Sequence, residues 1–204
     1  MLWLCGRREC NLGQVASYII DFERKKTSNP HHYVLYFFCV TTAGPQSNIK
    51  DLVIAFLQQL ARSAPLLKHL IVTTFLRSLA HAFLGKDQAF PVLWSLADDS
   101  SLHKIRYMIE VSSDNEHFEA LKAVFELRQL VVRELCIIVD GLDNVVRGVF
   151  IRKLRAFIEY LMKKLCNVKA LFTSLPQDDI KLQLEGLLFI EYDKERKGSA
   201  ILFL

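Results

Sequence analysis

The sequence predicts an α/β fold: a doubly wound, parallel, five-stranded sheet with helices on both faces, which makes a three-layer sandwich. Five short runs are nearly continuous in hydrophobicity rather than alternating, as is typical of parallel strands buried on both faces. Segments with helical periodicity lie between these runs, and the alternation of strands with helices indicates a doubly wound sheet. The predicted strands are residues 2–5, 34–39, 135–139, 170–173 and 187–191.

Helical patterns separate the predicted strands. Residues 13–26 (GQVASYIIDFERKK) follow the first strand, and residues 48–62 follow a Gly/Pro/Ser/Asn loop in which Ser47 or Asn48 can cap the helix. Residues 69–84 are a third candidate, although their β-branched members weaken the helical preference. Two further segments carry apolar side chains at helical spacing. They are residues 115–135 and 147–166.

Composition limits the functions to consider. The 204 residues suffice for one domain with a substantial core, and 51% hydrophobic with 24% charged residues fit a soluble globular protein. The net charge of +4 fits weak attraction to anions such as nucleotides, and no basic stripe interleaved with aromatics indicates nucleic-acid binding. No run approaches the roughly 20 apolar residues of a membrane span, and the start lacks a signal-peptide pattern. We therefore expect a cytoplasmic protein that binds neither nucleic acid nor membrane.

The cysteines and histidines give no metal motif. The five cysteines are scattered without C-x-x-C spacing, so neither a zinc site nor a disulfide framework is predicted. Cys5, Cys39 and Cys136 lie in apolar runs, where cysteine behaves as a small buried hydrophobe. His31 and His32 stand in the stretch SNPHHY before the second strand, and no third ligand has suitable spacing. We interpret this stretch as a surface loop.

The first strand leads into a loop with the outline of a phosphate-binding motif. An apolar run enters a turn at Gly6, and an amphipathic helical segment follows, as in the pattern G-x-x-x-x-G-K-[ST]. Counted from Gly6, the second glycine of the motif falls on Asn11, the lysine on Leu12 and the serine or threonine on Gly13. Asparagine tolerates a positive φ better than most residues, so the turn is expected to survive. The outline is present and its side-chain chemistry is missing.

Two later strands end in polar residues. The third predicted strand ends in LCIIVDGLDN, which places Asp140 at the carboxyl edge of the sheet, where ligands of open α/β sheets bind, and Asp143 just beyond it. In P-loop NTPases a carboxylate at this place holds Mg²⁺, and a second acidic group orients the attacking water. The fourth strand brings the hydroxyls of Thr173 and Ser174 to the same edge. The alternative interpretation is that all four residues only cap or turn the chain.

Taken in order, these stretches resemble the NACHT-type STAND NTPases, in particular the nephrocystin-3-like N-terminal domain abundant in fungal proteins. The family's first strand and loop typically read LWIxGKxGxGKSxLxxxII, and here the stretch is LWLCGRRECNLGQVASYII. VLYFFC resembles the second strand, LCIIVDGLDNV resembles hxhhhDALDEC, and VKALFTSLPQDDI resembles hKhLhTSRPExDI. The resemblance covers about residues 1–192 and implies a sheet of P-loop NTPase type with the strand order 5-1-4-3-2.

The resemblance also implies roles for individual residues. In the family the lysine contacts the phosphates and the next hydroxyl contacts Mg²⁺, whereas this chain has Leu12 and Gly13 at those positions. Asn144 replaces a glutamate, and Leu175 replaces the arginine of the sensor motif. The implied catalytic positions are Asp140 and Asp143, of which Asp140 would also be the Mg²⁺ ligand. The implied nucleotide-binding positions are Gly6, Cys10, Asn11, Leu12, Gly13, Gln14, Thr173 and Ser174.

Three interpretations follow. The first is a pseudo-NTPase, not an enzyme: a core of residues 1–192 and a short tail of residues 193–204, without the family's winged helix and repeats. It would bind Mg-ATP or Mg-GTP weakly or not at all, and act through protein partners and self-association as in STAND proteins. The second is an active NTPase in which Arg7 or Arg8, otherwise solvated surface residues, replaces the lysine. The third is an unrelated α/β binding domain or a non-functional fragment of a larger STAND protein.

Overall fold

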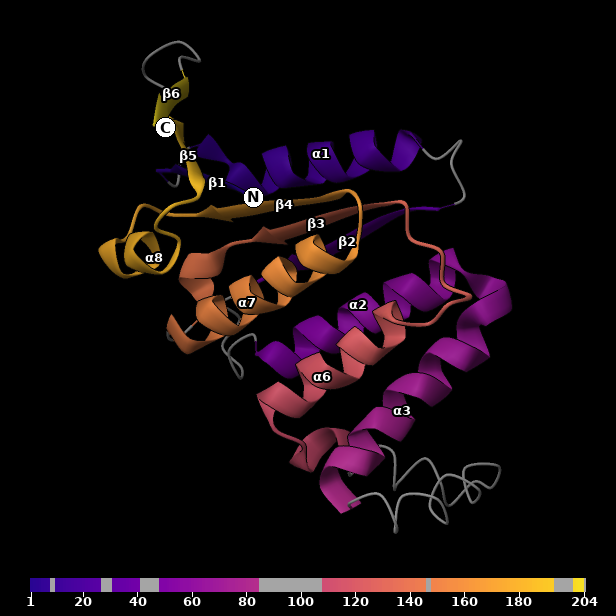
Figure 1. Ribbon diagram of the computed structural model, residues 1–204. Helices are drawn as coiled ribbons and strands as arrows, with labels where there is room; N and C mark the ends of the chain where they lie inside the picture. The colour runs from indigo at the N-terminus through magenta and orange to yellow at the C-terminus, as the bar shows by residue number, and fades with distance from the viewer. Residues whose placement is uncertain are drawn as a thin grey trace. The chain divides into compact units, whose positions relative to one another are not determined.

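The computed structural model describes residues 1–7, 10–26, 31–40, 48–84, 108–145, 148–192 and 200–203 (Figure 1). The chain forms two compact units. The first combines Met1–Asn48 with Val132–Leu204, and the second is Ile49–Val131. The first unit contains the whole sheet, and the second is helical.

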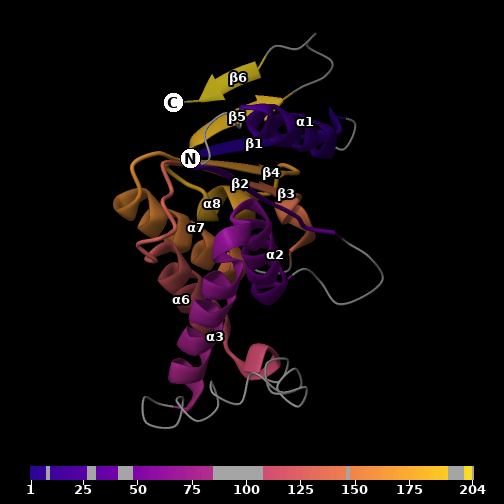
Figure 2. The same ribbon diagram turned by 90° about the vertical axis from the view of Figure 1, so that its right-hand side faces the viewer.

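The sheet of the first unit has the strand order β2-β3-β4-β1-β5-β6 (Figures 1 and 2). The first five strands in this order are mutually parallel, whereas β6 runs antiparallel to β5. The predicted parallel five-stranded sheet is therefore confirmed, and a sixth strand lies in the segment that we expected to be a tail. The strands are β1 (Leu2–Gly6), β2 (His32–Phe38), β3 (Glu134–Asp140), β4 (Val168–Ser174), β5 (Leu188–Tyr192) and β6 (Ala200–Phe203).

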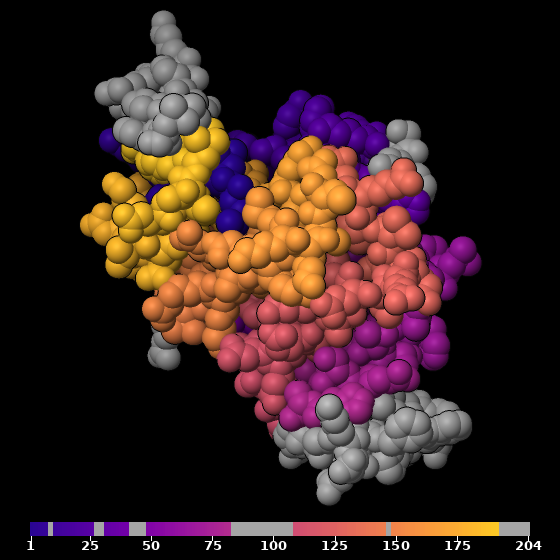
Figure 3. All heavy atoms as spheres, in the orientation of Figure 1, coloured from indigo at the N-terminus to yellow at the C-terminus, as the bar shows by residue number. Residues whose placement is uncertain are grey.

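Helices cover both faces of this sheet. Helix α1 (Leu12–Lys25) lies on one face and α7 (Gly148–Lys164) on the other, and the outer side of α7 is at the surface (Figures 1 and 3). The short α8 (Asp178–Gln183) packs against α7. Helix α1 packs on the sheet through its apolar face, on which Ala16 and Ile20 form a buried cluster with side chains of three strands. Those side chains are Val34, Cys136, Ile138 and Leu171.

Burial on both faces explains the continuous apolar runs. In β3 every residue from Leu135 to Val139 is buried, although successive side chains of a strand point to opposite faces. Cys136 and Ile138 point toward α1, so their neighbours in the strand point to the other face. The prediction that Cys5, Cys39 and Cys136 behave as buried hydrophobes is confirmed, since all three are buried free thiols.

The second unit is a helical cluster. It contains α2 (Ile49–Ser63), the 3₁₀ turn Pro65–Leu67, α3 (Lys68–Leu84) and α6 (Asp114–Phe125), and the three α-helices pack against one another. Helix α6 begins with a capping box, in which Ser113 and Glu116 exchange side-chain and backbone hydrogen bonds. It ends well before the end of the apolar pattern 115–135. None of the helices in the described parts of the chain has the length and apolar character that a membrane crossing requires.

A core substitution on α7 tests the three-layer arrangement. Phe157 is 1% exposed, so Phe157→Ala should lower the free energy of unfolding by about 3–5 kcal/mol through lost burial and a cavity. Met162 on the same helix is 39% exposed, so Met162→Ala should change it by less than about 0.5 kcal/mol. Urea denaturation followed by circular dichroism measures both values. Equal effects of the two substitutions would contradict the burial of this face of α7.

Candidate functional site

The loop between β1 and α1 keeps the backbone turn that the sequence predicts. Asn11 has φ +49° and ψ +48°, and it is the only non-glycine residue with a positive φ among those described. The Gln14 N–H donates to the Asn11 carbonyl at 2.8 Å, and the Cys10 N–H donates to the Arg7 carbonyl at 2.9 Å. Asparagine therefore occupies a left-handed conformation at the position where the phosphate-binding motif has glycine. Arg8, one of the two predicted substitutes for the lysine, lies outside the described residues.

The first residues of α1 lie beside the carboxyl end of β3. A Cβ atom on Gly13 would be 3.3 Å from Oδ2 of Asp140, so the backbone of α1 approaches this carboxylate closely. Position 13 is the one at which the motif has its metal-binding hydroxyl. The loop position and the carboxylate, which are far apart in the sequence, are therefore neighbours in the fold.

Thr173 holds the Asp140 carboxylate. The Thr173 hydroxyl donates to Oδ1 of Asp140 and accepts a hydrogen bond from the Gly141 N–H at 3.2 Å. Thr173 is fully buried. Burial raises the pKa of Asp140 above its ordinary value, the hydrogen bond from Thr173 lowers it, and the nearby charge of Asp143 raises it. Burial has the largest effect, so the protonated form of the Asp140 side chain is more favoured in the fold than it would be in water.

Gly141 allows the chain to turn directly after Asp140. It has φ +75°, and a Cβ atom there would lie 2.9 Å from the Cys39 carbonyl oxygen. Both the backbone conformation and the close approach therefore require glycine. The Asp-Gly pair after an apolar run is a turn signal in the sequence, so Gly141 could have been identified from it.

The other polar residues at this edge bind backbone groups. Oδ1 of Asp143 accepts from the Leu175 N–H at 2.9 Å, and Nδ2 of Asn144 donates to the Cys39 carbonyl at 2.9 Å. The Ser174 hydroxyl accepts from Nε1 of Trp3 at 3.0 Å and donates to the Leu175 carbonyl. Asp143 and Ser174 thus fix the carboxyl end of β4.

These elements surround a polar cavity of about 320 Å³. Of the predicted site residues it is lined by Leu12, Gly13, Asp140, Asp143, Thr173 and Ser174. The lining is completed by Arg7, Gly141, Asn144 and Leu175. The other predicted nucleotide-binding positions do not line the cavity; they are Gly6, Cys10, Asn11 and Gln14. Among the residues that the structure describes, the lining of the cavity includes two carboxyl groups and one basic side chain, the exposed Arg7. The cavity has the place of a phosphate site, and the described part of its lining lacks the usual density of positive charge.

The interpretation of the SNPHHY stretch is wrong for His32. His32 is the first residue of β2 and is only 7% exposed, because it lies between Glu23 of α1 and Glu134 of β3. No local spacing links these three residues, since they come from three separate elements. His31 precedes the strand and is partly buried.

Comparison of the sequence with models of known protein families gives no match, and comparison with curated proteins gives none either.

The partly buried carboxyl group of Asp140 predicts an effect on stability. Because the pKa of Asp140 is raised in the fold, its protonation favours folding. That contribution is complete below the pKa of the unfolded chain and is lost as pH rises through the folded value. Asp140→Asn should therefore raise the Tm at pH 7, since an amide avoids the burial of charge and its oxygen still accepts from Thr173.

The gain in Tm should shrink as the pH falls toward about 4, near the pKa of aspartate in an unfolded chain. Thermal unfolding of both proteins at a series of pH values measures it. The exposed Asp21 of α1 serves as a matched control, because Asp21→Asn should give no such gain. A lower Tm of Asp140→Asn at pH 7 would contradict the raised pKa.

Proposed function

We propose that this chain is a degenerate nucleotide-binding module of the NACHT or STAND type, a pseudo-NTPase that acts through protein contacts. The strand order supports this proposal. Reversed, the first five strands read β5-β1-β4-β3-β2, which is the order that the resemblance implies. β1 lies inside the sheet, and β3, which ends in Asp140, is two places away from it.

The observation that carries the proposal is the approach of Gly13 to Asp140. A phosphate-binding loop needs a turn, a helix N-terminus and a carboxylate near the metal-binding hydroxyl. The turn is present at Asn11, α1 starts at Leu12, and position 13 faces Oδ2 of Asp140. These positions support an arrangement that would place Mg²⁺ and phosphate at this edge, although Leu12 and Gly13 lack the side chains to bind them.

The missing side chains set the expected affinity. A hydrogen bond to a charged group contributes roughly 1.5–3 kcal/mol. Loss of the lysine, the metal-binding hydroxyl and the sensor arginine therefore removes on the order of 5 kcal/mol, more than a thousandfold in affinity at about 1.4 kcal/mol per tenfold. A micromolar site for Mg-ATP or Mg-GTP becomes millimolar. Protein partners, self-association and a cytoplasmic location belong to the same proposal, since the family acts through assembly.

An active NTPase is the second candidate function, and the position of Arg7 favours it. Arg7 lines the cavity together with Asp140 and Thr173, so its guanidinium can approach a bound phosphate. In this case Arg7→Ala would abolish nucleotide binding. In a pseudo-NTPase, Arg7→Ala would leave the already weak binding nearly unchanged.

Hydrolysis should be negligible. Phosphoryl transfer depends on positioning and on neutralising the charge that develops on the phosphate, and neither Leu12 nor Leu175 contributes to either. The purified protein should release phosphate from ATP or GTP no faster than an Asp140→Ala control in a coupled phosphate assay. Turnover above this control would contradict the pseudo-NTPase proposal.

Restoring the missing side chains should restore affinity. Asn11→Gly, Leu12→Lys and Gly13→Ser together give a glycine at the left-handed position, a phosphate ligand and a hydroxyl beside Asp140. Affinity for Mg-ATP should rise about tenfold or more, since one charge-assisted contact is worth at least roughly 1.4 kcal/mol. Fluorescent-nucleotide titration measures it.

The matched control is Asn11→Gly, Leu12→Met and Gly13→Ala, which adds similar bulk without the ammonium or the hydroxyl. It should show no gain. The gain of the first variant should disappear when Asp140→Ala is added. If the triple variant folds but binds Mg-ATP no better than the control, the loop after β1 is not part of a nucleotide site.

A further inference from the structure

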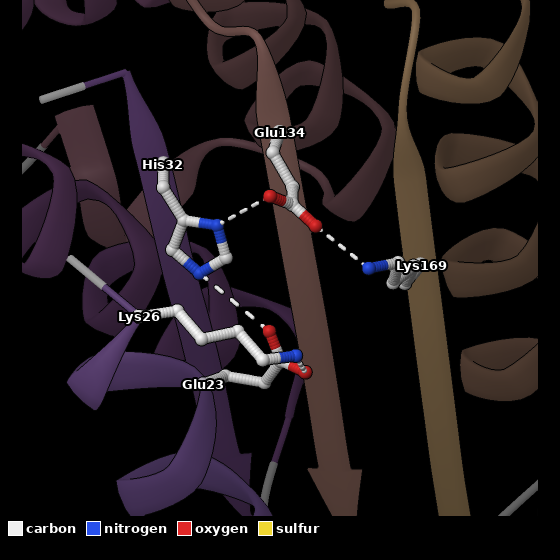
Figure 4. A network of polar contacts seen from close by, with 5 residues as sticks. All are labelled: Glu23, Lys26, His32, Glu134 and Lys169. Carbon is white, nitrogen blue, oxygen red and sulfur yellow. Dashed lines mark hydrogen bonds and ion pairs between the residues drawn. The ribbon is translucent and has the colours of Figure 1, made fainter. Parts of the chain in front are cut away.

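A second polar cluster lies at the opposite edge of the sheet (Figure 4). His32 and Glu134 are the first residues of β2 and β3 and are directly paired in the ladder, and Glu23 comes from the C-terminal part of α1. Glu23 lies 11 residues after Leu12, the first residue of α1, so at a rise of about 1.5 Å per residue the cluster is about 16 Å from the loop at the other end of the helix. The cluster is therefore independent of the nucleotide site.

The two carboxylates face different nitrogens of the same imidazole ring. Nδ1 of His32 lies 2.9 Å from Oε2 of Glu134, and Nε2 lies 3.7 Å from Oε2 of Glu23 (Figure 4). One ligand atom from each residue lies within 4.8 Å of the other two. The ring is thus held between two inward-pointing carboxylate oxygens.

Burial leaves these atoms without satisfactory partners. The His32 side chain is 1% exposed and that of Glu23 is 10% exposed. Neither nitrogen of His32 nor Oε2 of Glu23 makes a hydrogen bond of acceptable geometry. Buried polar atoms normally find a hydrogen-bond partner or an ion, so this cluster requires an explanation.

Two lysines contact the outer oxygens of the cluster. Nζ of Lys26 lies 2.6 Å from Oε1 of Glu23, and Nζ of Lys169 lies 2.6 Å from Oε1 of Glu134. Their side chains are 42% and 51% exposed, so both lysines approach from the solvent side. The inner oxygens remain directed at His32.

We infer that this cluster is a binding site for a divalent first-row transition metal ion of the Zn²⁺ class. Imidazole and carboxylate are ligands that such ions accept. In this site Nε2 of His32 and Oε2 of Glu23 bind the ion, and Glu134 accepts from Nδ1–H and orients the ring. A carboxylate behind a ligating histidine is the usual arrangement in metal sites.

The spacing fits such an ion with little movement. Zinc bonds to nitrogen and carboxylate oxygen are about 2.0–2.2 Å long, so two ligands of a tetrahedral ion are about 3.4 Å apart. The 3.7 Å between Nε2 and Oε2 of Glu23 is only slightly larger. The bound ion would join the C-terminal part of α1 to the first residue of β2.

Metal titration of the whole chain tests this inference. After treatment with a chelator and its removal, the protein should bind Zn²⁺ in a calorimeter at one ion per chain and show a higher Tm. His32→Gln and Glu23→Gln should each remove this binding. Glu134→Gln should weaken it by about 10–100-fold, as expected for loss of the group that orients a ligand. His31→Gln, the neighbouring histidine, is the matched control and should bind as the parent does.

The lysines provide a second variant that leaves all three cluster residues intact. Lys26→Met removes a cation that competes for Glu23, so it should strengthen Zn²⁺ binding. Absence of binding to the parent protein, or equal binding to His32→Gln and His31→Gln, would overturn the inference. The cluster would then be only an ion-pair network between α1, β2 and β3. Neither result depends on whether the cavity at the other edge binds nucleotide.

Discussion

Parallel pairing of the strands is the constraint on which the candidate site depends. Because β1, β3 and β4 run in the same direction, their carboxyl ends reach one edge of the sheet. The register places Cys5 opposite Ser174 and Val139 opposite Phe172. The loop after β1, the carboxylate at the end of β3 and the hydroxyl of Thr173 must therefore meet, although long segments of chain separate them. Side chains at this edge can change without loss of the arrangement, since the backbone ladder and the core determine it.

The chemistry at this edge has a cost in stability. The carboxyl group of Asp140 is partly buried, which disfavours its charged form, and the hydrogen bond from Thr173 compensates in part. Gly141 is held in a left-handed conformation against the Cys39 carbonyl. Features of this kind are expected at sites built for a ligand rather than for packing. In this chain they accompany Leu12 and Gly13 at the lysine and hydroxyl positions of the motif, which supports the proposed degenerate nucleotide site.

The sequence predicted the features that depend on local pattern. The five parallel strands were predictable because each carries a nearly continuous apolar run, which in β3 is buried on both faces. The turn at Asn11 was predictable because the allowed φ of a residue depends on its own side chain. β6 was not predicted, since an edge strand of four residues has too short a pattern to separate from a tail. Helix α6 ends before the apolar pattern does. This end was not predicted, because periodicity alone does not show where a helix stops.

The contacts between distant segments were beyond sequence analysis. His32 looked like part of a polar loop because its partners come from α1 and β3, and neither partner has a spacing that suggests a cluster. Six of the residues that line the candidate cavity were named from the sequence, but the contacts that they make were not. Asp143 binds the Leu175 N–H and Ser174 binds Trp3, and both contacts depend on how the strands are aligned. The alignment of the strands depends on packing across the whole sheet, and a short sequence motif carries no information about that packing.

The most direct test of the central claim is an isothermal calorimetric titration of the unmodified protein with ATP, in the presence and absence of Mg²⁺. The expected result is a dissociation constant in the millimolar range or no measurable heat, with little dependence on Mg²⁺. This is because the carboxylate of Asp140 lies beside Gly13, which offers no second metal ligand. Micromolar binding that requires Mg²⁺ would contradict the claim, and would mean that other residues of the site have replaced the missing lysine and hydroxyl.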